Sequence, residues 1–149
     1  GLKQLEIKIT VPGQPVPQGR PKFTTIGGHA RAYDPKKSVD YKKIVAYHAM
    51  QHKPKQLLEG ELEVEILIYK ECLKSFSRKK MELAELGQVR PVTKPDADNY
   101  AKGPLDAMKG IIWKDDGQIV DLIARKFYSN KPRIEITVRT LEEQQIKLV

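Results

Sequence analysis

The chain has 149 residues, a length typical of a single domain that buries a core, and no run of the about 20 apolar residues that a membrane helix needs. Its only cysteine excludes an intramolecular disulfide and a multi-cysteine zinc site, and together with an N-terminus unlike a signal peptide it favours a cytoplasmic protein. It carries 27 Lys and Arg against 19 Asp and Glu, a formal net charge of +8, which favours a polyanionic partner such as nucleic acid.

The first part of the chain predicts a strand, a loop, a hairpin and a helix. Residues 5–11 alternate apolar and polar side chains, which predicts a strand closed by a Pro-Gly turn. The proline-rich residues 12–22 predict an extended loop, and a central Gly-Gly pair in residues 23–35 favours a small hairpin. Residues 36–52 have helical spacing of their apolar side chains, and a proline then ends the helix.

The later part predicts three strands and two helices. The strands are expected at 62–69, 118–128 and 133–138, and the helices at 75–86 and at 105–108 with 111–112. The last two strands are expected to form a hairpin turned at 129–132. This order indicates one α+β (mixed α/β) domain over residues 1–149, with a small mostly antiparallel or mixed sheet and two to three helices.

Five aspartates crowd into residues 94–117 of this basic chain: Asp96, Asp98, Asp106, Asp115 and Asp116. Alternate side chains of an extended segment point the same way, so the carboxylates of Asp96 and Asp98 can converge on one point. Carboxylates that close repel each other unless a cation lies between them. Hard oxygen ligands suit Mg²⁺ or Mn²⁺, and Asp115 or Asp116 could supply a third ligand from another element.

Lys102 follows Asp98 by four residues, which places both on one face if the segment is helical. An ammonium group there could bind a phosphate oxygen, and with the carboxylates and a metal it suits hydrolysis of a phosphodiester. Pro104 leaves two possibilities, because proline inside a helix costs about 3 kcal/mol. Either the helix starts at Pro104 and a loop places Lys102, or the helix begins earlier and is kinked.

Each of these residues also has a structural interpretation. Asp96 or Asp98 could cap a helix N-terminus, and Asp115-Asp116-Gly117 could be a simple turn. Lys102 could be a solvated surface lysine. These alternatives stay open for each residue taken alone.

Residues 94–121, KPDADNYAKGPLDAMKGIIWKDDGQIVD, resemble the signature of RusA-type Holliday junction resolvases, endonucleases common in prophages. The matching residues are Asp96, Asp98, Asn99, Lys102, Asp106, Trp113, Asp115, Asp116, Gln118 and Val120. The upstream stretch VPQGRPKFT, residues 16–24, resembles the Gly-Arg-Pro-Arg/Lys-Phe opening of Gram-positive phage members of that family.

The resemblance implies a role in DNA recombination and repair. It implies Mg²⁺-dependent paired nicking of four-way junction DNA by a homodimer with one active site per subunit, leaving 5′-phosphate ends. Asp96, Asp98 and Asp116 would be the metal ligands and Lys102 the catalytic lysine, with Mn²⁺ able to replace Mg²⁺. No nucleotide cofactor and no membrane are expected.

DNA contacts are expected from further basic residues near these segments. Arg20 and Lys22 flank Pro21, which stiffens the loop that presents them, and Lys94 and Lys102 lie beside the aspartates.

The alternative function is a non-catalytic basic nucleic-acid-binding module, whose behaviour would need no metal and would not change in Asp98→Asn. Other Asp-x-Asp phosphate chemistry is disfavoured. Tyr100 stands where aspartyl-phosphate phosphatases usually carry Thr or Val, and sugar-nucleotide transferases are usually much longer. His48 and His52 have a spacing that can bind zinc, but no third ligand accompanies them, so a packed or half-solvated pair is expected.

Overall fold

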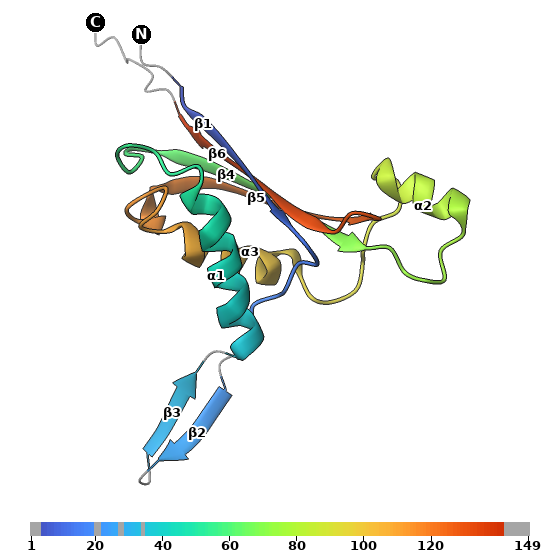
Figure 1. Ribbon diagram of the computed structural model, residues 1–149, viewed down its shortest axis with the longest axis horizontal. Coiled ribbons are helices and arrows are strands. Elements are labelled where there is room, and N and C mark those ends of the chain that lie inside the picture. Colours follow the sequence, from blue (N-terminus) through green and yellow to red (C-terminus); the bar gives the residue numbers. More distant parts are fainter. Residues whose placement is uncertain (1–3, 20–21, 27–28, 34, 142–149) are drawn as a thin grey trace, which may run out of the picture.

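The computed structural model describes residues 4–19, 22–26, 29–33 and 35–141, with only the backbone described for the second and third of these ranges. The elements are β1 (Glu6–Pro12), β2 (Lys22–Ile26), β3 (His29–Tyr33), α1 (Lys36–Met50), β4 (Leu62–Glu71), α2 (Arg78–Glu85), α3 (Ala97–Met108), the short 3₁₀ helix η1 (Asp116–Gln118), β5 (Ile119–Ser129) and β6 (Arg133–Thr140) (Figure 1). The expected fold class, an α+β domain with a small mixed sheet and two to three helices, is confirmed. In the described ranges no helix is both long and apolar enough to cross a membrane.

A four-stranded sheet in the order β1-β6-β4-β5 forms the centre of the molecule. β4 runs parallel to β5 and antiparallel to β6, and β6 runs antiparallel to β1. The strict alternation of β4 gives the sheet one apolar face, because Leu62, Val64, Ile66 and Ile68 all point to that face and are fully buried there. The sheet therefore has one apolar face that helices must cover.

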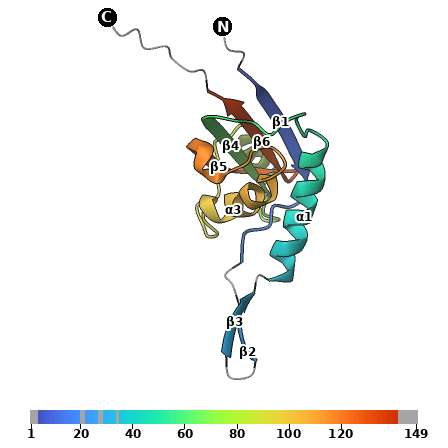
Figure 2. The same cartoon turned by 90° about the vertical axis from the view of Figure 1, so that its left-hand side faces the viewer.

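α1 and α3 lie against each other and cover that apolar face (Figures 1 and 2). α1 contributes Tyr41 and Val45 to the core, as its spacing predicts, but Ile44 is exposed and the buried face continues through Ala49 instead. Ser77 accepts a bond from the Lys80 amide and caps α2, so this helix starts later than predicted. α2 contacts β5 and projects from the end of the sheet (Figure 1).

The small hairpin predicted over residues 23–35 is confirmed in its backbone, since β2 and β3 pair antiparallel with each other in a separate sheet. The hairpin predicted from 118–128 and 133–138 is wrong. Both strands exist, but β4 lies between them and pairs with each. A central strand with a buried face needs neighbours on both sides, and the turn after Ser129 carries the chain across the end of β4. Glu85 holds that turn by accepting bonds from the Ser129 hydroxyl and the Asn130 amide.

The start of α3 decides between the two possibilities that Pro104 left open, in favour of the earlier start. The helix begins at Ala97, runs through Pro104 and ends at Met108, so the predicted segment 111–112 lies outside it. Burial of Tyr100, Ala101 and Met108 in the core stabilises a helix that the proline alone disfavours. Asp98 and Lys102 therefore lie in one continuous helix.

Candidate active site

Asp96 and Asp98 lie at the N-terminal end of α3. Asp96 occupies the N-cap position in an extended conformation, but its side chain makes no capping hydrogen bond and no ion pair with the described residues. Asp98 lies in the first turn of the helix, and its side chain is 68% exposed. Neither carboxylate is used to satisfy the backbone of the helix in the way that a capping aspartate usually is.

Lys102 lies on the same face as Asp98, as its spacing of four residues predicts. Its Nζ atom is 4.0 Å from Oδ2 of Asp98, and its side chain is 58% exposed. An exposed ion pair of this length contributes little stability, at most about 0.5 kcal/mol. The ammonium group can therefore turn to an anionic ligand at small cost.

Contacts from distant parts of the chain hold this end of α3 in place. The Nζ atom of Lys126, in β5, donates to the carbonyl oxygens of Thr93 and Pro95 at 2.9 and 3.0 Å. The backbone N–H of Gln18 donates to the Asn99 carbonyl at 2.8 Å. Sequence reasoning missed Lys126, and no local pattern could have found it, because its contacts lie more than thirty residues away along the chain.

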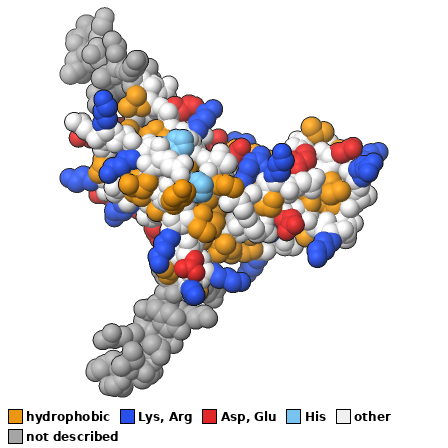
Figure 3. Space-filling model, viewed as in Figure 1, with side chains coloured by type: hydrophobic (Ala, Val, Ile, Leu, Met, Phe, Trp, Pro, Cys, Tyr) orange, Lys and Arg blue, Asp and Glu red, His pale blue; other side chains and the backbone are white. Residues whose placement is uncertain are grey.

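Positive charge surrounds the two carboxylates. Lys126 and Lys70 lie close enough that the pKa of Lys70 is lowered, first by burial and then by the charge of Lys126. Lys70 also lies 5.8 Å from the ring centre of Tyr100, in the second turn of α3. With the exposed Lys94 and Lys102, these lysines make the surroundings of α3 attractive to a polyanion. Lys and Arg side chains are also spread over the face seen in Figure 3, including the α2 segment.

Asp115 and Asp116 lie beyond the opposite end of α3, where both carboxylates have partners. Asp115 caps η1, accepting from the Gly117 amide at 3.0 Å in a capping box with Gln118. Asp116 Oδ1 accepts from Nε1 of the fully buried Trp113 at 2.7 Å. The turn interpretation therefore describes Asp115, whereas Asp116 is a half-buried carboxylate whose orientation an indole group fixes.

The structure does not bring Asp96, Asp98 and Asp116 together within one chain, contrary to the cluster expected from the sequence. In the described part of the chain, no three His, Cys, Asp or Glu side chains are grouped so that they could hold a metal ion. The 12 residues of α3 separate the two ends by about 18 Å. β5 starts just after Asp116, and its Lys126, which contacts Pro95, lies about 23 Å further along.

Asp96 and Asp98 by themselves still fit Mg²⁺. This ion keeps several of its waters and takes only one or two carboxylates together with substrate phosphates. The free carboxylate of Asp96 and the exposed carboxylate of Asp98 provide that donor set. A site with three carboxylates requires a contribution from elsewhere.

The candidate DNA-binding and zinc-binding residues lie in different surroundings. Arg20 lies outside the described residues, and so does the side chain of Lys22, whose backbone begins β2. Lys94 is exposed in the loop that leads to Asp96. His48 is half-buried and packs edge-on against Tyr47 at 5.3 Å, and the described residues offer no third zinc ligand.

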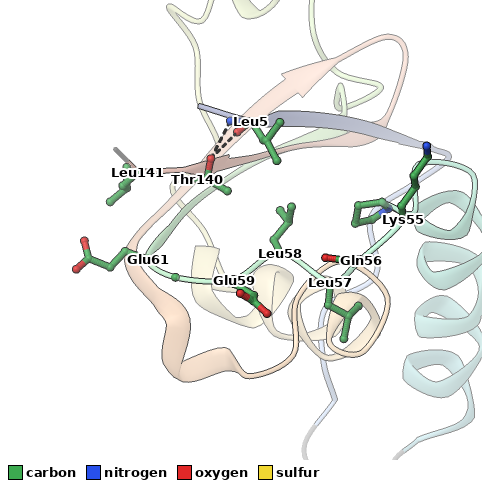
Figure 4. A pocket seen from close by; sticks show the side chains of 11 residues that line it. Leu5, Lys55, Gln56, Leu57, Leu58, Glu59, Glu61, Thr140 and Leu141 are labelled. Carbon is green, nitrogen blue, oxygen red and sulfur yellow. Dashed lines mark hydrogen bonds between the residues drawn. The ribbon is translucent and has the colours of Figure 1, made fainter. Parts of the chain in front are cut away.

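A pocket of about 910 Å³ has no aspartate among its lining residues. It is formed by the loop after α1 and by the adjoining ends of β1 and β6, where Leu5 and Thr140 bond to each other (Figure 4). The same loop is tied to the start of β5, since the Gln118 side chain donates to the carbonyl oxygens of Leu58 and Gly60.

Two comparisons place the chain among known proteins. The family model described as Endodeoxyribonuclease RusA matches residues 12–139. A protein of Bacillus subtilis (strain 168) named Uncharacterized protein YqaN is 47% identical over 135 residues, which cover 89% of this chain and 95% of that protein. The region that the family model matches contains α3, both groups of aspartates, β4, β5 and nearly all of β6, and this match confirms the resemblance seen in the sequence. The chain therefore belongs to the RusA endodeoxyribonuclease family.

Proposed function

We propose that this chain is a Mg²⁺-dependent endodeoxyribonuclease that resolves four-way DNA junctions by paired nicks, acting as a homodimer in the cytoplasm. The observation that carries the proposal is the N-terminal end of α3. There, two carboxylates without a capping role adjoin Lys102 and other lysines in a chain of the RusA family.

Each residue at this end has a distinct role in the proposal. Asp96 and Asp98 hold Mg²⁺, for which Mn²⁺ can substitute. When bound, the ion supplies Lewis-acid chemistry, which favours attack of water on phosphorus and offsets the charge of the leaving 3′ oxygen. Lys102 moves from its exposed pair with Asp98 to a phosphate oxygen and stabilises the negative charge that develops there. The products carry 5′-phosphate and 3′-hydroxyl ends.

Asp116 enters the same site from a second copy of the chain. Asp96 precedes the first residue of α3, Asp116 lies beyond its last, and a helix of this length spans about 18 Å, so we infer that one metal ion does not reach both within a single chain. A homodimer removes this difficulty, because the end of α3 in one copy can lie beside η1 of the other. The bond from Trp113 would then orient the Asp116 carboxylate toward the shared site.

DNA is bound mainly through its phosphates. Lys94 and Lys102 would contact the strand that is cut, since both are exposed beside the two carboxylates. Arg20 and Lys22 are proposed as further backbone contacts.

The proposal is tested with a labelled synthetic four-way junction and a linear duplex of the same sequence. Wild type, Asp98→Asn and the control Asp40→Asn, an exposed aspartate on α1, are each incubated with Mg²⁺ and with EDTA. We expect wild type and Asp40→Asn to make paired nicks in the junction only with Mg²⁺, and Asp98→Asn to bind the junction without cutting it. Binding by wild type with no metal-dependent cutting would instead support the non-catalytic nucleic-acid-binding module.

A further inference from the structure

β5 is an edge strand of the main sheet, and the first half of its open side is uncovered. It pairs with β4 on one side, and no described strand lies on the other. Val120 and Leu122, two large apolar residues near its start, are 54% and 51% exposed. An apolar edge of this kind is a template for pairing with another strand.

We propose that two copies of the chain pair antiparallel through β5, about a two-fold axis at Ile123, and so form one continuous sheet. Its consequence for the metal site rests on the proposed function, whereas the pairing surface depends on β5 alone.

The limits of the free edge fix the position of the axis. At its start, the register with β4 shifts so that Ile119 and Asp121 face consecutive residues of β4, which leaves a bulge at Val120. At its far end, Nε of Arg90 donates to the Lys126 carbonyl and occupies the edge there. The regular and uncovered part is therefore 121–125, and Ile123 is its midpoint.

Backbone N–H and C=O groups of this segment point to the open edge of the sheet. The Lys126 carbonyl points away from β4, because Arg90 reaches it from outside the sheet. Backbone groups of alternate residues point to the same edge, so those of Ala124 and Leu122 also face outward. In a pairing centred on Ile123, Leu122 of one copy lies opposite Ala124 of the other, and their outward N–H and C=O groups bond to each other.

The charged residues of this segment are complementary between two antiparallel copies. In the same register, Asp121 of one copy lies opposite Arg125 of the other, and the two-fold axis repeats the pair. Both residues are exposed, and neither forms an ion pair with the described residues of its own chain. Opposite charges directly across an antiparallel pair stabilise it, whereas a slip by two residues would remove both contacts.

The other edge of the sheet is less suited to such pairing. On β1, the charged side chains are already occupied, since Glu6 pairs with Lys8 at 3.5 Å and with Arg139 at 2.9 Å. β1 also ends at Pro12, which has no N–H group to donate.

Pairing through β5 would bring the separated carboxylates together. An antiparallel copy places η1, at the start of one β5, beside the far end of the other β5. There Lys126 holds the segment that leads to Asp96. The helices also fit, because α3 contacts both β4 and β5. With strands about 4.8 Å apart, two such helices would lie about 9.6 Å apart, a usual packing distance.

Disulfide cross-linking tests the two-fold axis. In a Cys72→Ser background, which removes the only native thiol, we would compare Ile123→Cys with Lys8→Cys on the opposite edge strand. The Cα atoms of the two residues at the axis would lie about 4.5 Å apart, which is within the range found for disulfides. We expect Ile123→Cys to oxidise to a dimer on a non-reducing gel and Lys8→Cys to stay monomeric. No dimer from Ile123→Cys, or equal dimer from both, would overturn the pairing.

Charge reversal provides a second test that introduces no cysteine. Asp121→Arg and Arg125→Asp should each weaken the dimer about tenfold in sedimentation, because each places like charges across the axis. The double variant should restore it, whereas unchanged association of both single variants would contradict the register. Both tests use protein without DNA or metal. A chain that nicks junctions but fails both tests overturns the pairing alone, and a chain that passes them but does not nick junctions overturns the function alone.

Discussion

The two ends of α3 carry the same kind of side chain in opposite situations. At the N-terminal end, Asp96 has no partner among the described residues and Asp98 has only a long, exposed pair with Lys102. Beyond the C-terminal end, Asp115 caps a turn and Asp116 accepts a bond from an indole. A carboxylate that stabilises its own backbone is used for folding, whereas one without such a partner is available for a ligand. Asp116 is intermediate, because one of its oxygens is held and the other is not.

The largest effect is expected at the N-terminal end. Asp98→Asn removes a proposed metal ligand, and loss of such a transition-state contact should lower single-turnover cleavage of a junction by about a thousandfold. Its free energy of unfolding should change by less than about 0.5 kcal/mol, because the side chain is exposed. A large loss of stability measured by urea unfolding would mean that Asp98 is structural, and the contrast between the two ends would fail.

Beyond the C-terminal end of α3, Asp116 is a proposed metal ligand, whereas its neighbour Asp115 is only a capping residue. Asp116→Asn should lower cleavage by about a hundredfold or more while the protein remains folded, since an amide oxygen can still accept from Trp113. Asp115→Asn should cleave within about twofold of wild type, because asparagine caps as well as aspartate does. Equal loss of cleavage rate in both variants would contradict this assignment.

Lys102→Ala should lower the cleavage rate by about a hundredfold through lost stabilisation of phosphate charge. Lys109→Ala, which removes an exposed lysine at the C-cap of the same helix, is the matched control. Both variants lose one positive charge, so a general effect of charge on DNA binding would appear in both. Similar rates for the two variants would show that Lys102 has no special role.

Trp113→Phe tests whether the indole positions Asp116. It removes the 2.7 Å hydrogen bond and should raise the Mg²⁺ concentration for half-maximal cleavage by about tenfold, the effect of losing an orienting partner. The buried site should also lose about 1–3 kcal/mol of stability. A lower stability with an unchanged Mg²⁺ requirement would leave Trp113 as a core residue only.

Local sequence patterns predicted the helices and strands that depend mainly on interactions between residues close together in the sequence. Alternating apolar and polar residues predicted β1 and β4, and paired glycines predicted that β2 and β3 pair as a hairpin. The start of α3 stayed open between two possibilities, because the rule that proline ends helices does not include the burial of Tyr100 and Met108, which stabilises the earlier start. The order of β5 and β6 around β4 depends on contacts between distant segments, so no local pattern contains it.

The candidate site was predictable in parts. The spacing of Asp98 and Lys102 predicted their shared face, and the structure confirms it. The separation of Asp116 could not be predicted, because it depends on the full length of α3, which the sequence pattern underestimated. Lys126 was missed for the related reason that its contacts with Thr93 and Pro95 exist only in the folded chain.

The most direct test of the shared site mixes two inactive proteins. Asp98→Asn and Asp116→Asn are each assayed alone on a four-way junction with Mg²⁺, then co-refolded in equal amounts and assayed again. If one site takes Asp98 from one copy and Asp116 from the other, each mixed dimer contains one intact site, and the mixture should regain nicking. A mixture as inactive as its components, under conditions where wild type refolded in the same way cleaves, would contradict a site shared between two chains.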